Sequence, residues 1–471
     1  MPAKYHIHVH PVARRFPAPG KTTILDWGEG CLRCTHCVKE TCPYQAFQQR
    51  DFDPDSLTDT IDNYCKNCYR CVQGCPRELV MKAPNPQYRT LGDSYWKPEI
   101  ILSTYYQAET GKIPVSGAGY GGPFAGSGFD SFWTDMSEIV RPTRDGIHGR
   151  EYISTAIDLG RKPLFLVFDD KGELAFNPPL LIEIPLPVLL AEPPWGAAPD
   201  KVRHAVVQAA GMLGTLALIP RENLDSAFDQ AASRVVPSYL YETINLDDPL
   251  LAQVSMVEIA DHARVLEKLE ALKKRFPQLI AMVRVPADGE CEARVAELTG
   301  AGAEVIHLVA DHHAQGLGDA KDVHLKDLIR RCHLRLVEDN LRDTVTLLVS
   351  GGIALAEHVA KAIICGADGV IIDLPLLLAL ECRLCRRCRN RGSCPVRMDR
   401  LDARQGAQRL VNLLGAWNNQ LLEVLGAMGL REVRRLRGEV GRAMFVEDLQ
   451  REIFAPLFAQ QAGEGGRREG M

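Results

Sequence analysis

The chain has 471 residues, of which 46% are hydrophobic and 24% are charged, and its formal net charge is −5. The composition is typical of globular proteins, and the length exceeds one ordinary domain. The small negative charge argues against nucleic acid or an anionic membrane as a partner. No apolar run approaches the ~20 residues that a membrane span requires.

The N-terminal stretch MPAKYHIHVHPVARRF lacks the apolar core of a signal peptide. Its alternation places His6, His8 and His10 on one face of an extended segment. Three histidines could bind a metal, but we prefer an exposed edge strand. Most of the 15 cysteines fall in three motifs, and thiolate ligands require a reducing compartment. We therefore expect a soluble, cytoplasmic protein.

Two cysteine motifs lie close together near the N-terminus. They contain Cys31, Cys34, Cys37 and Cys42, and then Cys65, Cys68, Cys71 and Cys75, each motif ending in Cys-Pro. A disulfide framework suits short secreted chains, and a zinc site usually has two C-x-x-C pairs. The run C-x-x-C-x-x-C-x3-C-P is instead the iron–sulfur pattern of two-cluster ferredoxins. Residues 1–88 are thus predicted to form a leader and an α+β domain with two 4Fe-4S clusters.

In this pattern three thiolates of one motif bind one cluster, and the fourth binds the other cluster. The predicted ligands of the first cluster are Cys31, Cys34, Cys37 and Cys75, and those of the second are Cys65, Cys68, Cys71 and Cys42. The first motif has one extra residue before Cys42, which a loop can absorb.

Residues 89–178 are interpreted as a glycine-rich connector. PNPQY and LGDSYWKPE are typical of a linker. The segment at 112–130 contains GAGYGG, which is close to a dinucleotide-binding fingerprint. No strand and helix frame this motif with an acidic residue at the right distance, so we expect a loop that covers another site.

Between 179 and 398, strand-like apolar runs alternate with helical ones, which predicts parallel strands with crossover helices. The strands we expect are LIEIPLPVLL, GTLALIP, SYLYETINL, QVSMVEIA, LIAMVRV, AEVIHLVA, VTLLVSGG and GVIIDL. Eight strands fit a closed (βα)8 TIM-type barrel, and a doubly wound open sheet is the alternative. Phosphate sites in such barrels follow the last two strands. Ser350, Gly351, Gly352 and Asp373 are therefore the candidate phosphate-binding residues, with a simple tight turn as the alternative.

A third cysteine motif, LECRLCRRCRNRGSCPV, follows the last predicted strand. It contains Cys382, Cys385, Cys388 and Cys394, and several arginines surround it. We predict a third Fe-S cluster, 4Fe-4S or 3Fe-4S, with zinc as the alternative. Nearby cations would favour the reduced cluster and raise its potential, and they could also dock an acidic partner.

After the barrel, residues 399–460 show helical periodicity, and 461–471 read as a frayed tail. Cys291, Cys332 and Cys365 lie outside the motifs and are interpreted as ordinary core or surface thiols.

The order of these parts resembles the archaeal-type glutamate synthase family. The resemblance is most specific at 92–117, which includes YWKPEIILSTYYQAETGKIPVSG, and at 345–395, which includes VSGGIALAEHVAKAIICGADGVIID and the third cysteine motif. It implies an FMN-binding barrel, an adjacent iron–sulfur centre, and reduction of 2-iminoglutarate to glutamate. Nothing resembles the amidotransferase domain that releases ammonia from glutamine, so that step would need a separate subunit.

The chain departs from the family pattern at the substrate side. AEPPWGAAPD, IPREN, IADHARVLEKL and ADHHAQGLG replace the family's flavin and substrate loops, and Arg284 stands where a lysine is expected. The Gly-Thr that completes the family's phosphate site corresponds to Asp373-Leu374, and a carboxylate there would repel a phosphate. Arg284, with Arg221 as a further candidate, is the cation that remains for a substrate carboxylate, and Arg284, His312 and His313 are the candidate catalytic residues of such an altered pocket.

Three functions are compatible with these features. The preferred one is an electron-transfer subunit, with or without FMN, that works with other redox subunits or with a ferredoxin or NAD(P)H oxidoreductase. The second is a working glutamate synthase that acts on 2-oxoglutarate and ammonia. The third is a redox-sensing regulatory or assembly protein.

Overall fold

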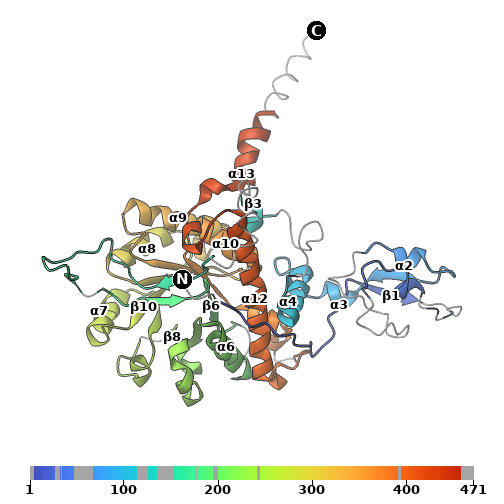
Figure 1. Ribbon diagram of the computed structural model, residues 1–471, viewed down its shortest axis with the longest axis horizontal. Coiled ribbons are helices and arrows are strands. Elements are labelled where there is room, and N and C mark those ends of the chain that lie inside the picture. Colours follow the sequence, from blue (N-terminus) through green and yellow to red (C-terminus); the bar gives the residue numbers. More distant parts are fainter. Residues whose placement is uncertain are drawn as a thin grey trace, which may run out of the picture.

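The computed structural model describes residues 5–26, 32, 34, 36–46, 67–113, 126–134, 153–176, 178–194, 200–240, 244–390 and 394–457. At its centre is a closed barrel of eight parallel strands (Figure 1). The strands are β6 (Val188–Ala191), β7 (Ala217–Pro220), β8 (Val235–Tyr239), β9 (Met256–Ala260), β10 (Ile280–Pro286), β11 (Val305–Val309), β12 (Thr346–Ser350) and β13 (Gly369–Ile372). They follow one another around the barrel in chain order, and β13 closes onto β6. The barrel is confirmed over the open sheet.

Helices surround the barrel and explain why its strands read as continuous apolar runs. The crossover helices are α6 (Asp200–Leu213), α7 (Val265–Arg275), α8 (Cys291–Gly300), α9 (Leu325–Glu338) and α10 (Ala356–Cys365), and α11 (Leu374–Ala379) follows the last strand. Shorter 3-10 segments are η7 (Arg221–Asn223), η8 (Ser226–Arg234), η9 (Pro249–Ala252) and η10 (Gly318–Ala320). Because both faces of each strand are covered, strands such as β11 are buried at every position.

The third predicted strand was placed too far along the chain. We expected 238–246, but β8 is Val235–Tyr239. The strand begins with Val235 and Val236, which are buried, and it contains Pro237. A proline cannot donate to a sheet ladder, and the pairing of β8 with β9 begins only at Ser238, after the proline. The strand therefore tolerates a residue that reads as a strand breaker in the sequence.

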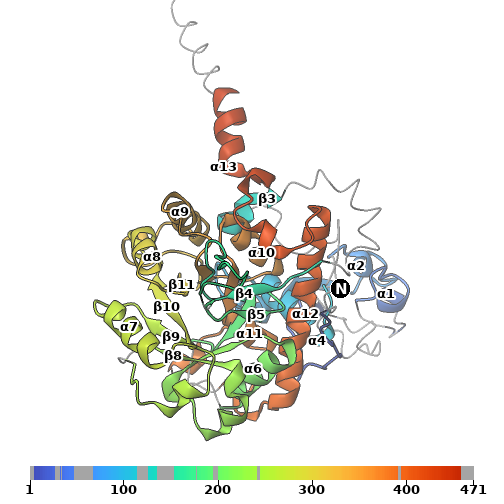
Figure 2. The same ribbon diagram turned by 60° about the vertical axis from the view of Figure 1, so that its left-hand side comes forward.

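A two-stranded hairpin lies across the amino-terminal end of the barrel (Figure 2). It consists of β4 (Ile157–Leu159) and β5 (Ile182–Ile184), which pair antiparallel. The Thr346 hydroxyl, at the start of β12, lies 3.0 Å from the carbonyl oxygens of Asp158 and Gly160. The hairpin thus closes the end of the barrel at which the strands begin.

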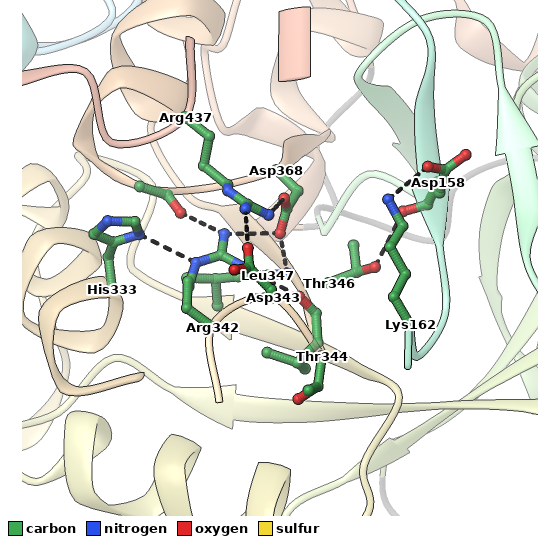
Figure 3. A network of polar contacts seen from close by, with 12 residues as sticks. Asp158, Lys162, His333, Arg342, Asp343, Thr344, Thr346, Leu347, Asp368 and Arg437 are labelled. Carbon is green, nitrogen blue, oxygen red and sulfur yellow. Dashed lines mark hydrogen bonds and ion pairs between the residues drawn. The ribbon is translucent and has the colours of Figure 1, made fainter. Parts of the chain in front are cut away.

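A buried ion-pair network also lies at this end (Figure 3). Asp368, just before β13, accepts hydrogen bonds from Arg342 at 2.8 Å, from Arg437 at 3.0 Å and from the main-chain N–H of Leu347 at 2.7 Å. The Arg342 guanidinium also donates to His333 and to the carbonyl oxygen of Gly366. Because Arg437 comes from the C-terminal segment, the network fastens that segment to the barrel.

The C-terminal part begins with the long helix α12 (Ala403–Ala427), which packs against α6, α10 and α4 (Pro98–Thr110). The prediction that helices continue to 460 is wrong in part. The chain instead forms 3-10 segments η13 (Val433–Leu436) and η14 (Val440–Arg442), strand β14 (Ala443–Phe445), helix α13 (Val446–Leu449) and the π-helical turn η15 (Gln450–Phe454). Helix α12 ends at Ala427, and Gly429 follows with a φ of +70°, a left-handed conformation that suits glycine at a helix end. Strand β14 then pairs with β3 (Phe132–Thr134), which follows the 3-10 segment η4 (Gly128–Ser131).

The leader is extended, as predicted, but it is not an edge strand. Residues 5–14 do not form a strand, and they alternate between half-buried and exposed positions, with His6, His8 and His10 exposed. The segment lies on α12, where the Asn412 amide exchanges hydrogen bonds with the main chain of His10. The exposed histidines therefore reflect the alternation of a docked segment.

The remaining elements belong to the N-terminal unit. They are β1 (Thr22–Asp26), α1 (His36–Lys39), α2 (Arg70–Gln73), β2 (Met81–Pro84) and α3 (Pro86–Arg89), and β1 pairs antiparallel with β2. This unit lies to one side of the barrel, beyond α4 (Figure 1). No helix among the described residues is long and apolar enough to cross a membrane.

Candidate functional site

The two N-terminal cysteine motifs come together in space. Each places a one-turn helix, α1 or α2, over part of its cysteine run. Burial, together with the nearby Cys75, Cys71 and Cys34, raises the pKa of the Cys37 thiol to about 11. Cys37 thus lies close to cysteines of both motifs, and the exchange of the fourth ligand stays a prediction. Cys31 and Cys65 lie outside the described residues.

The surroundings of Cys75 stabilise the thiolate form of its side chain. Its sulfur accepts the main-chain N–H of Leu79 at 3.4 Å. Burial would raise the pKa of Cys75, but N–H groups of the residues that follow, including those of Leu79 and Arg77, lower it below its ordinary value. Main-chain N–H groups directed at a sulfur are the kind of contact that tunes the potential of a thiolate-bound cluster.

The third cysteine motif begins directly after α11, at the carboxyl-terminal end of the barrel. Burial raises the pKa of Cys382 to about 12, with further contributions from Cys385, Cys394 and Cys388, so the four thiols lie near one another. The described cysteines are all free thiols. Among the described residues, no three His, Cys, Asp or Glu side chains are already arranged around a metal position, so the twelve cluster ligands remain a prediction.

The segment LGDSYW, residues 91–96, joins this motif to the barrel. Main-chain Gly92 donates to the carbonyl oxygen of Arg383 at 3.2 Å, and the Asp93 carboxylate lies 2.6 Å from the Arg386 guanidinium. On the other side, the Tyr95 hydroxyl donates to the carbonyl oxygen of Gly352 at 2.5 Å, and the Trp96 indole N–H donates to that of His312 at 2.8 Å. One short segment therefore contacts both the cysteine loop and two loops at the carboxyl ends of the strands.

Arg284 lies near the carboxyl end of β10 and is half-buried. Within the described part of the chain its guanidinium forms no ion pair or hydrogen bond. Its charge acts on Glu258, His307 and Asp373, because it contributes to the pKa shifts of all three. Among the described residues, Arg284 is thus a cation without a hydrogen-bonded or ion-paired partner, at the end of the barrel where catalytic groups of such folds reside.

Gly351 and Gly352 form the turn after β12, with φ values of +106° and +65°. A Cβ atom on Gly351 would lie 2.6 Å from the carbonyl oxygen of Ala310, and one on Gly352 would lie 2.3 Å from the main-chain nitrogen of Ala314. The glycines are therefore required where this turn packs against the loop after β11. Within the described residues the N–H groups of both glycines donate no hydrogen bond, so they are available to an anion.

Asp373 follows β13 and caps α11. Its carboxylate accepts the main-chain N–H of Leu374 at 2.5 Å, so an anion already occupies the start of this short helix. Burial raises the pKa of Asp373, although the same hydrogen bond and the charges of His312 and Arg284 oppose the shift. The Asp373 carboxylate thus takes the N–H of Leu374 that a phosphate at this helix start would otherwise use.

The two candidate histidines, His312 and His313, lie in different surroundings. Main-chain His313 donates to the Asp311 carboxylate at 2.8 Å, and its side chain turns to Asp93, with 3.1 Å between Nε2 and Oδ2. His312 stays close enough to Asp373 to affect the pKa of that carboxyl. Arg284, His312 and Asp373 are therefore brought together, whereas His313 belongs to the contact with LGDSYW.

A polar network inside the barrel was not found from the sequence. The Glu258 carboxylate contacts the Ser238 hydroxyl and the His307 imidazole, and His307 Nε2 lies 2.8 Å from the Ser350 hydroxyl. Glu258 and His307 are each 1% exposed. The only available signal was a charged or ionisable residue in the middle of an apolar strand, in MVEIA and VIHLV, which is rare unless the group is paired.

The barrel sequence matches a known family. The conserved region in glutamate synthase matches residues 250–431. This span begins before β9 and ends after α12, so it includes Glu258, His307 and Ser350 of the interior network, the Gly351–Gly352 turn and the third cysteine motif.

Full-length relatives are distant. The chain is 27% identical over 484 residues to an archaeal-type glutamate synthase (NADPH) of Dehalococcoides mccartyi, with 89% of this chain and 94% of the relative covered. It is 26% identical over 502 residues to the archaeal glutamate synthase (NADPH) of Archaeoglobus fulgidus, covering 92% and 96%. A solved flavocytochrome b2 variant with bound pyruvate is similar at a TM-score of only 0.40 and 14% identity, over 66% of this chain and 86% of that one, and this weak likeness carries no functional argument. The chain thus carries the conserved region of glutamate synthase and is a distant, full-length homologue of the archaeal-type glutamate synthases.

Proposed function

We propose that this protein is an iron–sulfur electron-transfer subunit of the glutamate synthase type, in which the third cysteine motif exchanges electrons with a group at the carboxyl end of the barrel. The supporting observation is the LGDSYW segment. Through Asp93 it contacts the cysteine loop, and through Tyr95 and Trp96 it contacts the turns after β12 and β11. Two redox groups held by one rigid, hydrogen-bonded segment would keep a fixed separation.

The group at the barrel would be FMN, which supplies one- and two-electron chemistry when it is bound. The unpaired N–H groups of Gly351 and Gly352 fit a phosphate, and the Arg284 cation would favour an anionic ligand. Asp373 opposes the fit because its carboxylate takes the N–H of Leu374. These residues therefore fit a weakly held flavin. Other redox subunits, or a ferredoxin or NAD(P)H oxidoreductase, would exchange electrons with the chain.

Replacing Asp373 tests whether FMN binds here. Asp373→Asn keeps a side-chain oxygen to cap α11 but removes the charge, and Asp373→Gly removes both. If the phosphate lies near this carboxylate, both variants should bind FMN about tenfold or more tightly, since relief of ~1.4 kcal/mol is worth a factor of ten. Equilibrium dialysis against FMN measures the change. No binding by wild type or by either variant would remove flavin from the proposal.

The iron content tests the cluster assignment. Protein purified without air should contain about twelve iron and twelve sulfide per chain, because each four-cysteine motif suits one cubane cluster. Eight iron, or zinc in place of one set, would remove the third centre and with it the electron path to the barrel. The visible spectrum of the same sample reports its flavin.

A second candidate is a working glutamate synthase, which the names of the homologues support. Arg284, without a partner among the described residues, and the nearby His312 could bind the carboxylate of 2-oxoglutarate. Ammonia would come from a separate amidotransferase subunit. Anaerobic assays with reduced ferredoxin or NADPH, 2-oxoglutarate and ammonia should yield glutamate in this case. If the wild type binds FMN but forms no glutamate, and Arg284→Ala also forms none, the electron-transfer subunit is favoured.

A further inference from the structure

Three strands contribute one hydrogen-bonded chain inside the barrel. Glu258 Oε1 on β9 lies 2.5 Å from His307 Nδ1 on β11, and His307 Nε2 lies 2.8 Å from Ser350 Oγ at the end of β12. The Ser238 hydroxyl on β8 contacts the second oxygen of Glu258. The groups are in the order carboxylate, imidazole, hydroxyl, which is the order that activates a serine in acyl-transfer enzymes.

The hydrogen bonds fix the tautomer of His307. Burial would raise the pKa of Glu258, but the neighbouring His307, Arg284 and Ser238 hold it below its ordinary value, so the carboxylate is ionised and can only accept. Burial lowers the pKa of His307 and keeps the imidazole neutral. Nδ1 therefore carries the proton that is donated to Glu258, and the lone pair of Nε2 faces the Ser350 hydroxyl. This is the arrangement of a general base.

Ser350, at the end of this series of hydrogen bonds, is the group that a ligand could reach. Glu258 and His307 are fully buried, whereas Ser350 is half-buried at the carboxyl end of its strand. The N–H groups of Gly351 and Gly352, which follow the serine directly, donate no hydrogen bond within the described residues. Free N–H groups next to a nucleophile are what stabilise the oxyanion in acyl transfer.

We propose that Ser350 is a nucleophile, with His307 as its general base and Glu258 as a positioning residue, and that the barrel accepts an acyl group from a carboxylate-bearing ester or thioester. Ser350 Oγ forms a bond to the acyl carbon while its proton moves to His307 Nε2. The same proton then leaves with the alcohol or thiol as the carbon–oxygen or carbon–sulfur bond breaks. A water molecule then gives a proton to His307 Nε2 and forms a bond to the acyl carbon. The bond between that carbon and Ser350 Oγ breaks, and the proton passes from His307 to the serine as the acid leaves. Arg284 would bind the carboxylate of the substrate. This activity goes beyond electron transfer and needs no redox group.

The competing interpretation is a satisfied polar network that only fills the barrel interior, in which case the Ser350 hydroxyl is inert. A fluorophosphonate probe separates the two. Attack by Ser350 would form an oxygen–phosphorus bond and release fluoride, with the proton taken by His307. The protein is treated both as purified and after dialysis to remove dissociable flavin, and the labelled peptide is identified by mass spectrometry.

We expect labelling at Ser350 in the wild type and none there in Ser350→Ala. His307→Gln keeps a hydrogen-bonding side chain but is no base, so labelling should slow by at least about 100-fold. Glu258→Gln should slow labelling to a rate between those of the wild type and His307→Gln. The matched control is His333→Gln, which changes a buried histidine at the opposite end of the barrel and should label at the wild-type rate.

The pH profile adds a readout that a structural role would not change. The charged groups that face His307 are Glu258 from β9, Arg284 from β10 and Asp373 from β13. Because burial lowers the pKa of His307, the labelling rate should fall only in acid, and His307→Gln should lose this dependence. Absence of the label from Ser350 in both wild-type samples, or equal rates in wild type and His307→Gln, would overturn the proposal. Labelling of flavin-free protein would support this proposal even if the proposed electron-transfer function were wrong.

Discussion

Cys382→Ser should remove the third iron–sulfur centre and leave the two N-terminal clusters in place. Cys382 is the first predicted cluster ligand after the barrel, and its carbonyl oxygen accepts a hydrogen bond from Tyr105 at 2.9 Å. A serine hydroxyl does not replace a thiolate as a cluster ligand, because it stays protonated and is a harder donor. We expect about eight iron per chain instead of about twelve, together with loss of one of three paramagnetic signals after reduction. Iron analysis and electron paramagnetic resonance measure both.

Cys365→Ala is the control for the loss of a thiol. Cys365 is buried in α10 and lies outside the three motifs, so the variant should keep all of its iron. Loss of every cluster in Cys382→Ser would show that the centres are not independent. Unchanged iron in that variant would show that Cys382 is not a ligand.

Asp368→Ala should strongly destabilise the barrel. The substitution leaves the buried Arg342, whose side chain is 4% exposed, without its carboxylate, and it also removes a contact of Arg437. Breaking a buried ion pair by removing one partner costs about 3–5 kcal/mol, which corresponds to a fall in melting temperature on the order of 10 °C for a domain of this size. Thermal unfolding followed by circular dichroism measures the shift.

Asp343→Ala is the matched control, since Asp343 contacts the same Arg437 but is 75% exposed. Exposed ion pairs contribute about 0–1 kcal/mol, so this variant should unfold close to the wild type. Equal effects of the two substitutions would mean that burial of the network does not determine its contribution.

The difference in stability between wild type and Asp368→Ala should change with pH in a definite direction. Burial would raise the pKa of Asp368, but Arg342 and Arg437 hold it below its ordinary value. A lowered pKa in the folded state means that the stabilisation is present above the unfolded pKa of about 3.9 and is lost as the pH falls further. The gap in stability between wild type and Asp368→Ala should therefore shrink below about pH 4.

The sequence by itself determined the features that depend on local spacing. The predicted helix DKVRHAVVQAAGML has the bounds of α6, because its apolar residues repeat with the helical period. All eight predicted strands overlap barrel strands, since a strand covered on both faces must be apolar along its length. The spacing of the cysteines defined three motifs without reference to any fold. The turn at Gly351–Gly352 was also recognised, although its tight packing against Ala310 and Ala314 was not.

Tertiary structure alone decided which of these residues meet. The sequence places His313 with Arg284 among the candidate catalytic residues, but its side chain pairs with Asp93, which is 220 positions away in the chain. Glu258, His307 and Ser350 come from three strands, and no local pattern connects them. Sequence periodicity reports which face of an element is buried. It does not report the register in which separate strands close into a barrel, and that register places a carboxylate, an imidazole and a hydroxyl within hydrogen-bonding distance.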